Sequence, residues 1–376
     1  MSRTELIKII KYYQLDFRFS HWKEHLFMAE QKIYSDDFCD VLLDEARFDG
    51  EKIGESGNWL YRPPTVDELG NPDIDLGNLI ELEQQRFGIK FLDRPRNCLI
   101  LGGAGSGKTV CTRNICINVD KLNQKQKGNP TLLCIIDQKS DYAGDFKDNI
   151  IGETSIFSVI KNLKFGLNGP KNVPPYIWIG QVSISLAGRL GLITSRTCLT
   201  SIIATLLPLL NKGLNRKDLN DPSVSSDLIW PSLETILKIT QEKKIMEIFS
   251  SKAVYSQSLS QSLEGLLQDS GELFNCCNGL DINDIFQKQR HCIIHTLNLP
   301  AYVTHIITDI CINQVLVKRI AENYKTDHTD IIFVLDECDL LLGSDISNFP
   351  DLSPLDKLFR LGREMGVMSI VNISGI

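Results

Sequence analysis

The feature that most constrains the fold of this chain is the glycine-rich stretch LILGGAGSGKTVCTRNICI, residues 99–117. An apolar run over residues 98–101 leads into the glycines, and an amphipathic pattern that predicts a helix follows them. Glycines let consecutive backbone N–H groups turn inward without Cβ clashes, and the helix adds the positive end of its dipole. This order of strand, loop and helix predicts a phosphate-binding site and disfavours a chance glycine turn.

The loop and the first turn of the predicted helix carry the groups that a bound nucleotide needs. The spacing Gly102-x-x-x-x-Gly107-Lys108-Thr109 supplies an ammonium for the β- and γ-phosphates and a hydroxyl for Mg²⁺. ATP and Mg²⁺ are therefore the expected cofactors, and Lys108 is expected to assist catalysis. The residues expected to contact the nucleotide are Gly102, Gly103, Ala104, Gly105, Ser106, Gly107, Lys108, Thr109 and Val110.

A second acidic site is expected after the apolar run in DIIFVLDECDLLL. A parallel strand buried on both faces is typically a continuous apolar run, as residues 331–335 are. Ligands of open α/β sheets bind beyond the carboxyl ends of the strands. Asp336 is therefore expected to hold the Mg²⁺ ion with Thr109, and Glu337 to polarise the attacking water.

Other apolar runs predict further strands of the same sheet. TLLCIIDQKSDYAGDF at residues 131–146 contains one such run, and RHCIIHTLNLP at residues 290–300 contains another, followed by a helical pattern. Alternating strands and helices predict a mainly parallel sheet flanked by helices, an α/β fold. The residues between about 185 and 289 form a largely helical pattern, which we interpret as an insertion.

Several segments together resemble the FtsK/HerA-type P-loop ATPases, which are additional-strand RecA-like proteins related to conjugative coupling and secretion ATPases. DLGNLIELEQQRFGIKFLDRPRNCLILGGAGSGKT is similar to their lead-in to the phosphate loop, and LFRLGREMGVMSIVNIS to their helix, turn and sensor strand. IIDQKSDYAGD resembles their second strand, with Gln138 in place of the usual proline. The resemblance implies a RecA-like ATPase domain over residues 76–376 and leaves residues 1–75 as an N-terminal region of unknown role.

The resemblance also assigns roles near the carboxyl end of the sequence. The family's sensor side chain corresponds to Ser374, and Asn372, on the same strand face, could substitute for it. Arg363 matches a position that often reaches a neighbouring subunit's nucleotide, although an exposed arginine closing a helix is an equal alternative. Arg360 is the reserve candidate. The domain is expected to end at this sensor strand, and one flank of the strand is expected to be open to another segment.

Composition bounds the alternatives. The 376 residues carry a formal net charge of -7, which excludes a uniformly basic surface but allows a local basic patch. The 11 cysteines include no C-x-x-C pair, which favours a reducing, cytoplasmic compartment. The amino-terminal residues lack a signal-peptide pattern. The apolar segment at residues 197–210 is too short for a membrane span, so we expect a soluble protein and a buried helix there.

Two other groups of residues are weaker candidates. His291, Cys292 and His295 are zinc-ligand types, but a strand spaces the histidines apart, so core or edge histidines are the favoured interpretation. The stretch KLNQKQKGN contains Lys121, Lys125 and Lys127 and is expected to form a loop. These lysines are either solvated or in contact with the phosphates of a nucleic acid.

The leading hypothesis is an ATP-hydrolysing motor subunit that moves duplex DNA. It would act as a homo-oligomeric ring, a hexamer by the resemblance, or inside a larger complex with a partner chain that completes the ATPase domain. One alternative is a nucleotide-dependent regulatory or scaffold subunit, for example of a bacterial defence system. Another is a secretion or conjugation motor.

Overall fold

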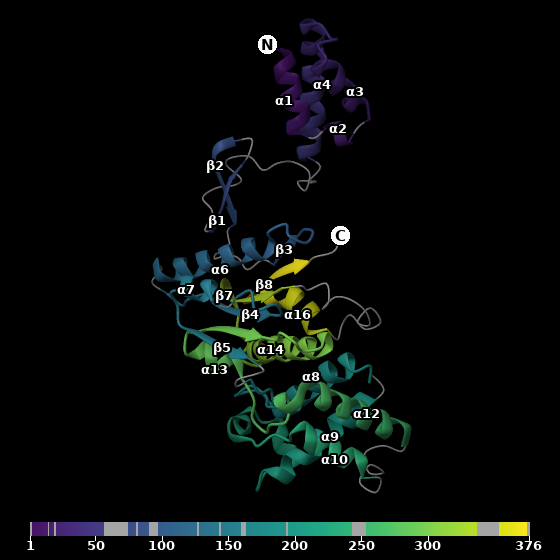
Figure 1. Cartoon of the computed structure of the whole chain (residues 1–376), viewed down its shortest axis with the longest axis vertical. Coiled ribbons are helices and arrows are strands. Elements are labelled where there is room, and N and C mark those ends of the chain that lie inside the picture. The colour runs from purple at the N-terminus through teal and green to yellow at the C-terminus, as the bar shows by residue number, and fades with distance from the viewer. Residues whose placement is uncertain are drawn as a thin grey trace. The chain divides into compact units, whose positions relative to one another are not determined.

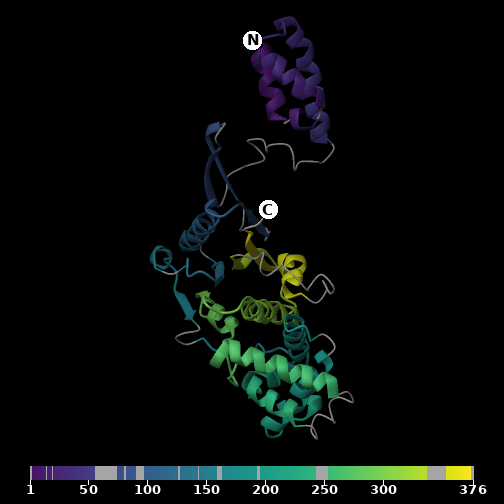
Figure 2. The same cartoon turned by 45° about the vertical axis from the view of Figure 1, so that its right-hand side comes forward.

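The computed structural model divides the chain into two compact units, which we describe separately (Figure 1, Figure 2). One unit comprises Met1–Pro72 and Gly77–Gly88, and the other comprises Asp73–Leu76 and Ile89–Ile376. The residues that the structure describes are 2–13, 15–18, 20–55, 74–79, 82–89, 97–125, 128–142, 144–158, 163–192, 195–242, 253–336 and 353–373.

The first unit contains four described helices with a small core of their own. They are α1 (Ser2–Tyr12), α2 (Leu15–Arg18), α3 (Ser20–Glu30) and α4 (Asp36–Glu55). Apolar side chains at helical spacing, such as Leu6 and Ile10 of α1, are fully buried. The buried Trp22 fills the centre and donates its indole N–H to Asp49 at 2.8 Å. Strands β1 (Ile74–Leu79) and β2 (Leu82–Ile89) form a separate two-stranded sheet.

The second unit is built on a six-stranded sheet in which every described pair of neighbours is parallel. The strand order is β3-β8-β7-β4-β6-β5. The strands are β3 (Cys98–Leu101), β4 (Leu132–Asp137), β5 (Thr154–Ser158), β6 (His291–His295), β7 (Thr326–Leu335) and β8 (Met365–Ile373). The expected parallel α/β sheet is therefore confirmed.

Helices cover both faces of this sheet because its central strands are apolar on both sides. Side chains alternate along β4, so that Cys134 and Ile136 lie in one core and Leu133 and Ile135 in the other. The second core is closed by α6 (Lys108–Lys125) and α7 (Asp145–Asn149). On the opposite face lies α14 (Ala301–Ala321), which is buried along most of its length (Figure 1).

The larger core continues from α14 into a layer of helices. These are α8 (Pro175–Arg189), α9 (Arg196–Leu210), α10 (Leu233–Gln241), α12 (Ala253–Ser270) and α13 (Ile282–Gln287), with short 3₁₀ turns at Arg216–Asn220, Pro222–Asp227 and Gly271–Leu273. Residues 197–210 lie in α9, a partly buried helix, as expected. None of the described helices is long and apolar enough to cross a membrane.

Strand β8 occupies an interior position in the sheet. It pairs with β3 on one side, where Leu101 is opposite Ile373, and with β7 on the other, where Leu335 is opposite Val371. The expectation of an open flank on this strand was therefore wrong. The reason is that the chain returns from α16 (Pro354–Leu361) and the 3₁₀ turn Gly362–Glu364 between two strands formed earlier in the sequence.

A buried polar cluster joins α8, α14 and α16. Arg189 of α8 donates from Nε and Nη2 to the Asp309 carboxylate of α14, at 2.8 and 3.0 Å. Lys357 of α16 donates to Gln181 at 2.5 Å. Burial raises the pKa of Asp309 above its usual range, and the charges of Arg189 and Lys357 oppose that rise. Arg189 therefore keeps a buried carboxylate compensated where three helices meet.

His305 adds a pH-sensitive group to this cluster. Its Nε2 atom is buried and has no hydrogen-bond partner among the described residues. Burial, followed by the positive charge of Arg189, lowers the pKa of His305 from 6.5 to about 4. The unfolded chain therefore binds a proton at this residue more readily than the folded chain does.

We predict that His305→Gln makes the free energy of unfolding depend less steeply on pH under acidic conditions. In the wild type, the histidine contribution is complete above pH 6.5 and is lost as pH falls toward about 4, at up to about 1.4 kcal/mol per pH unit. The measurement is the free energy of unfolding in urea at several pH values in this window. Equal slopes for wild type and His305→Gln would contradict the prediction.

Candidate nucleotide-binding site

The glycine-rich loop lies between the carboxyl end of β3 and the first turn of α6. Gly105 and Gly107 have φ angles of +75° and +87°, a region that side chains with a Cβ rarely adopt. Lys108 folds back over the loop, and its Nζ atom donates to the carbonyl oxygens of Gly102 and Gly103 at 2.7 and 2.8 Å. Val110, in the first turn of α6, is exposed. The expected strand, loop and helix are therefore assembled around an open surface.

Asp336 lies directly after β7 and faces this loop. Its side chain is buried, and its Oδ2 atom lies 3.5 Å from the hydroxyl of Thr109. These two residues are 227 positions apart in the sequence. The structure therefore brings together the hydroxyl and the carboxylate that the sequence assigned to one metal ion.

Asn372 of β8 connects the carboxylate to α6. Its Nδ2 atom donates to Asp336 Oδ1 at 3.0 Å, and its Oδ1 atom lies 2.9 Å from the hydroxyl of Thr112. Asn372 and Thr112 are fully buried. Because a carboxylate only accepts, Asp336 fixes Nδ2 as the end of the amide that faces it, and Oδ1 is left to accept from the hydroxyl of Thr112. Sequence reasoning missed Thr112, although it lies one helical turn after Lys108.

The end of β4 contributes a second support. Gln138 Nε2 donates to the Asp336 carbonyl oxygen at 3.4 Å. The neighbouring Asp137 is fully buried and accepts backbone N–H groups of Lys139, Asp141 and Tyr142. Asp137 therefore stabilises the turn after β4, and Gln138 is the residue of this pair that contacts the candidate metal ligand.

The histidines of β6 pair with buried carboxylates. Leu133 donates its N–H to His291 Nδ1 at 3.1 Å, so the His291 proton lies on Nε2, which is 3.0 Å from Asp120 Oδ1. Burial raises the pKa of Asp120, but hydrogen bonds from His291 and two backbone N–H groups outweigh it and hold the pKa below its usual range. His295 lies 2.7 Å from Asp137. Among the described residues, no three or more His, Cys, Asp or Glu side chains are grouped so that they could hold a metal ion.

The two candidate arginines differ in their surroundings. Arg360 is exposed and pairs with Asp356 at 3.0 Å. Arg363 is also exposed and makes no hydrogen bond or ion pair with another described residue. Arg363 precedes the amino end of β8, whereas Asn372 is near its carboxyl end, about 20 Å away at 3.3 Å per strand residue. The structure therefore does not bring Arg363 to the loop of its own chain.

Of the remaining candidate residues, two lie in a different structure from the one expected, and three lie outside the described residues. Lys121 and Lys125 lie inside α6, so the expectation of a loop at these positions was wrong. The helix ends at Lys125, before Gly128 and Pro130, and proline cannot continue a helix. Lys127 lies outside the described residues, as do Glu337 and Ser374. The proposed roles of Glu337 and Ser374 stay predictions.

Two thiols flank the loop. Burial raises the pKa of Cys98 to about 11, with a smaller contribution from nearby Cys111. Burial also raises the pKa of Cys111. Both thiols are therefore protonated at neutral pH and pack as small apolar groups.

The fold is similar to solved structures of the VirB4 and TrwB proteins. VirB4 of Thermoanaerobacter pseudethanolicus matches with a TM-score of 0.50 and 14% sequence identity, over 81% of this chain and 77% of that chain. The bacterial conjugative coupling protein TrwB, in an unbound monoclinic form, matches with a TM-score of 0.49 and 14% identity, over 75% of this chain. This chain covers 63% of that TrwB chain, less than two thirds of its length.

No protein-family model and no curated protein matches the sequence. The similarity to VirB4 is a similarity of fold. The α/β fold that the sequence predicted, a parallel sheet flanked by helices, is thereby confirmed.

We predict that Thr112→Val destabilises the protein through Asn372. Valine keeps the volume but removes the hydroxyl, which leaves a buried amide oxygen without a donor at a cost of about 1–3 kcal/mol in the free energy of unfolding. Thr112→Ser restores the hydroxyl and should recover most of the loss. Urea unfolding of the three proteins measures the difference. A Thr112→Val variant as stable as the wild type would show that the amide is oriented by other contacts.

Proposed function

We propose that this chain binds and hydrolyses ATP with Mg²⁺ as a subunit of a molecular motor. The observation that carries the proposal is the approach of Thr109 to Asp336, 3.5 Å apart beside a glycine-rich loop at the carboxyl edge of a parallel sheet. Open α/β sheets bind ligands at this edge. Phosphate groups fit here because backbone N–H groups and the amino end of α6 supply positive potential.

Lys108 is the side chain proposed to bind the β- and γ-phosphates. Its two present acceptors are neutral backbone carbonyls of the loop itself. Phosphate oxygens are stronger acceptors for an ammonium because the hydrogen bonds are then charge-assisted on both sides. The loop therefore holds Lys108 close to the place where phosphates would bind.

Oxygen ligands of the right kind for Mg²⁺ are present. Thr109 and Asp336 supply a hydroxyl and a carboxylate, the hard donors that this ion takes together with water and nucleotide phosphates. Bound Mg²⁺ would neutralise charge on the β- and γ-phosphates. Asn372 prepares the site by holding one carboxylate oxygen of Asp336 through a hydrogen bond and leaving the other toward Thr109.

Hydrolysis is proposed to use residues next to this core. Glu337 follows Asp336 in the sequence and would accept a proton from the attacking water. Ser374, two residues after Asn372, would sense the γ-phosphate. Arg363 would contact a nucleotide held by a neighbouring subunit, a role supported by its exposure and by its distance from the loop of its own chain. Activity would then require an oligomer, for which a hexameric ring is the form that the sequence resemblance suggests.

The proposed cargo is duplex DNA, bound through its phosphates without sequence preference. With a formal net charge of -7, the chain can supply such contacts only through a local basic surface. A secretion or conjugation motor and a nucleotide-dependent scaffold subunit share the same nucleotide chemistry. The three functions differ in what stimulates turnover.

The test is the ATPase rate per subunit as a function of protein concentration, with and without duplex DNA. We expect the wild-type rate to rise with concentration as subunits assemble and to rise again when DNA is added. Arg363→Ala should lower the assembled rate by about 10³–10⁵, the contribution of an arginine that stabilises transition-state charge in trans.

Matched variants separate the possible results. Arg360→Ala, one helical turn away and paired with Asp356, should retain the wild-type rate, while Lys108→Ala should lose ATP binding. Concentration-dependent turnover without DNA stimulation would favour a secretion-type motor, and ATP-dependent assembly without turnover would favour a scaffold. A fast rate at every concentration in both wild type and Arg363→Ala would contradict catalysis between subunits.

A further inference from the structure

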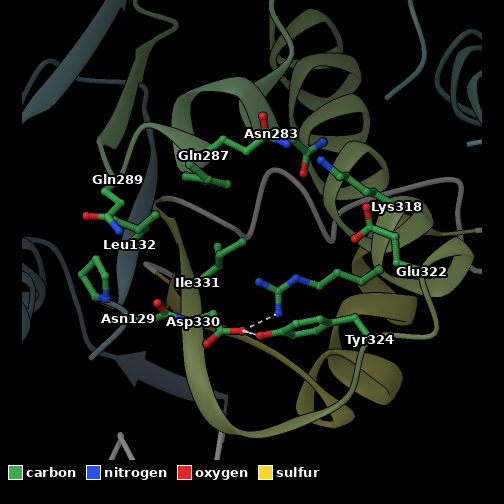
Figure 3. A pocket seen from close by; sticks show the side chains of 13 residues that line it. Asn129, Leu132, Asn283, Gln287, Gln289, Lys318, Glu322, Tyr324, Asp330 and Ile331 are labelled. Atoms are coloured by element: carbon green, nitrogen blue, oxygen red, sulfur yellow. Dashed lines mark hydrogen bonds and ion pairs between the residues drawn. The ribbon is translucent and has the colours of Figure 1, made fainter. Parts of the chain in front are cut away.

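A cavity lined by both polar and apolar residues lies toward the amino ends of the strands, opposite the glycine-rich loop. It has a volume of about 350 Å³ and is lined where β4 begins, at Leu132, and by Ile331, which pairs with Leu132 on β7. The five residue-to-residue steps from Leu132 to Asp137 place it about 16 Å from the carboxyl ends of the strands. Its volume is at the lower end of the range for small-molecule sites. Figure 3 shows Lys318 and Glu322 on one side of this pocket and Leu132 and Gln289 on the other.

Lys318 of α14 supplies an ammonium without a close partner. The residue is 9% exposed, and its side chain makes no hydrogen bond or ion pair with another described residue. The positive charge of Lys318 lowers the pKa of Asp281, although burial, the largest cause, raises it. The Asp281 carboxylate accepts hydrogen bonds from the backbone and side-chain nitrogens of Asn283. Glu322, four residues along the helix, is exposed and forms no ion pair with Lys318. An ammonium with unused N–H groups, on a largely buried residue, therefore lines the cavity.

Arg319 supplies a guanidinium that is fixed in place. Its Nη1 atom donates to Asp330 at 2.9 Å and to the carbonyl oxygen of Met365. The ring of Tyr324 lies under the guanidinium, 4.6 Å from the carbon to the ring centre, and the Tyr324 hydroxyl donates to Asp330 at 2.7 Å. Nε and Nη2 make no hydrogen bond with the described residues. These remaining N–H groups keep the planar fork that suits carboxylates and phosphates.

The rim of the cavity adds side-chain amide groups, and one of them, Gln289, has an unusual backbone conformation. Asn129, Gln287 and Gln289 line the cavity. Gln289 has a φ angle of +55°, which is uncommon for glutamine and places it in the left-handed region. The local backbone hydrogen bond from Gln289 N–H to the Phe286 carbonyl, 2.9 Å, fixes this turn. The cavity is therefore a preformed polar site with spare donors.

We propose that this cavity binds the phosphate group of a small phosphate monoester, with Lys318 and Arg319 as its cationic ligands. Among the described residues, the carboxylates that line it are Asp330, which Arg319 and Tyr324 already engage, and the exposed Glu322. A phosphate dianion has three terminal oxygens and can accept more of the unused N–H groups than a carboxylate can. The amides of the rim would hydrogen-bond the organic part of the ligand. The site is separate from the nucleotide loop and does not depend on the proposed ATPase function.

The test is isothermal titration of the full chain carrying Lys108→Ala, which removes the main phosphate ligand of the nucleotide loop. AMP, inorganic phosphate and citrate are the three probes. We expect AMP to bind at one site per chain and Lys318→Met to weaken that binding at least about tenfold, since a charge-assisted hydrogen bond is lost. Glu322→Gln should tighten AMP binding by about two- to fivefold because a competing acid is removed. Inorganic phosphate should bind more weakly than AMP, because it lacks the groups that the rim amides contact.

Lys288→Met is the matched control, because Lys288 is exposed and does not line the cavity. It should leave AMP binding unchanged, and thermal unfolding of each variant checks that the fold is retained. AMP binding that is unaffected by Lys318→Met, or absent altogether, would overturn the proposal. Citrate binding as tightly as AMP would overturn the assignment to a phosphate. ATP binding by the wild type is measured separately, so failure of the nucleotide loop and failure of this cavity give different results.

Discussion

The amide of Asn372 links the parts of the candidate site that come from distant segments of the chain. One end of the amide holds Asp336 at the tip of β7, and the other meets Thr112 on the helix that follows the glycine-rich loop. This is possible because β8 lies between β3 and β7, so that three strand ends meet at one edge. A parallel sheet directs these ends to the same side, and the buried amide then sets the orientation of the carboxylate.

The opposite edge and the helical layer depend on other buried charges. Arg189 and Asp309 join α8 to α14, and α14 also carries Lys318 and Arg319 at its carboxyl end. Arg319 reaches Asp330 of β7 and the carbonyl of Met365 at the start of β8. Helix α14 therefore contacts the helical layer along its length. At its carboxyl end, Arg319 contacts β7 at Asp330 and β8 at Met365. The nucleotide loop and the proposed phosphate cavity lie at opposite edges of strands that belong to the same sheet.

Short sequence patterns predicted those parts of the structure that depend on residues close together in the sequence. The loop at residues 102–107 and the acid after β7 could be found because each follows a short apolar run in the sequence, 98–101 and 331–335. The contact between Thr112 and Asn372 could not be predicted, since 260 residues separate them and no motif assigns a role to Thr112. The interior place of β8 was also missed, because strand order is decided by packing between segments that are remote in sequence. Lys318 and Arg319 look like ordinary basic residues at a helix end, and only the fold places them in a cavity.

The central claim is that the loop and Asp336 form one magnesium–nucleotide site. The most direct measurement is the affinity of a non-hydrolysable ATP analogue with and without Mg²⁺, for wild type and Asp336→Asn. The account predicts that Mg²⁺ tightens binding to the wild type by about tenfold or more, and that Asp336→Asn, which removes the charge at nearly constant shape, loses most of that gain. An equal effect of Mg²⁺ on both proteins, or no binding by the wild type, would contradict it.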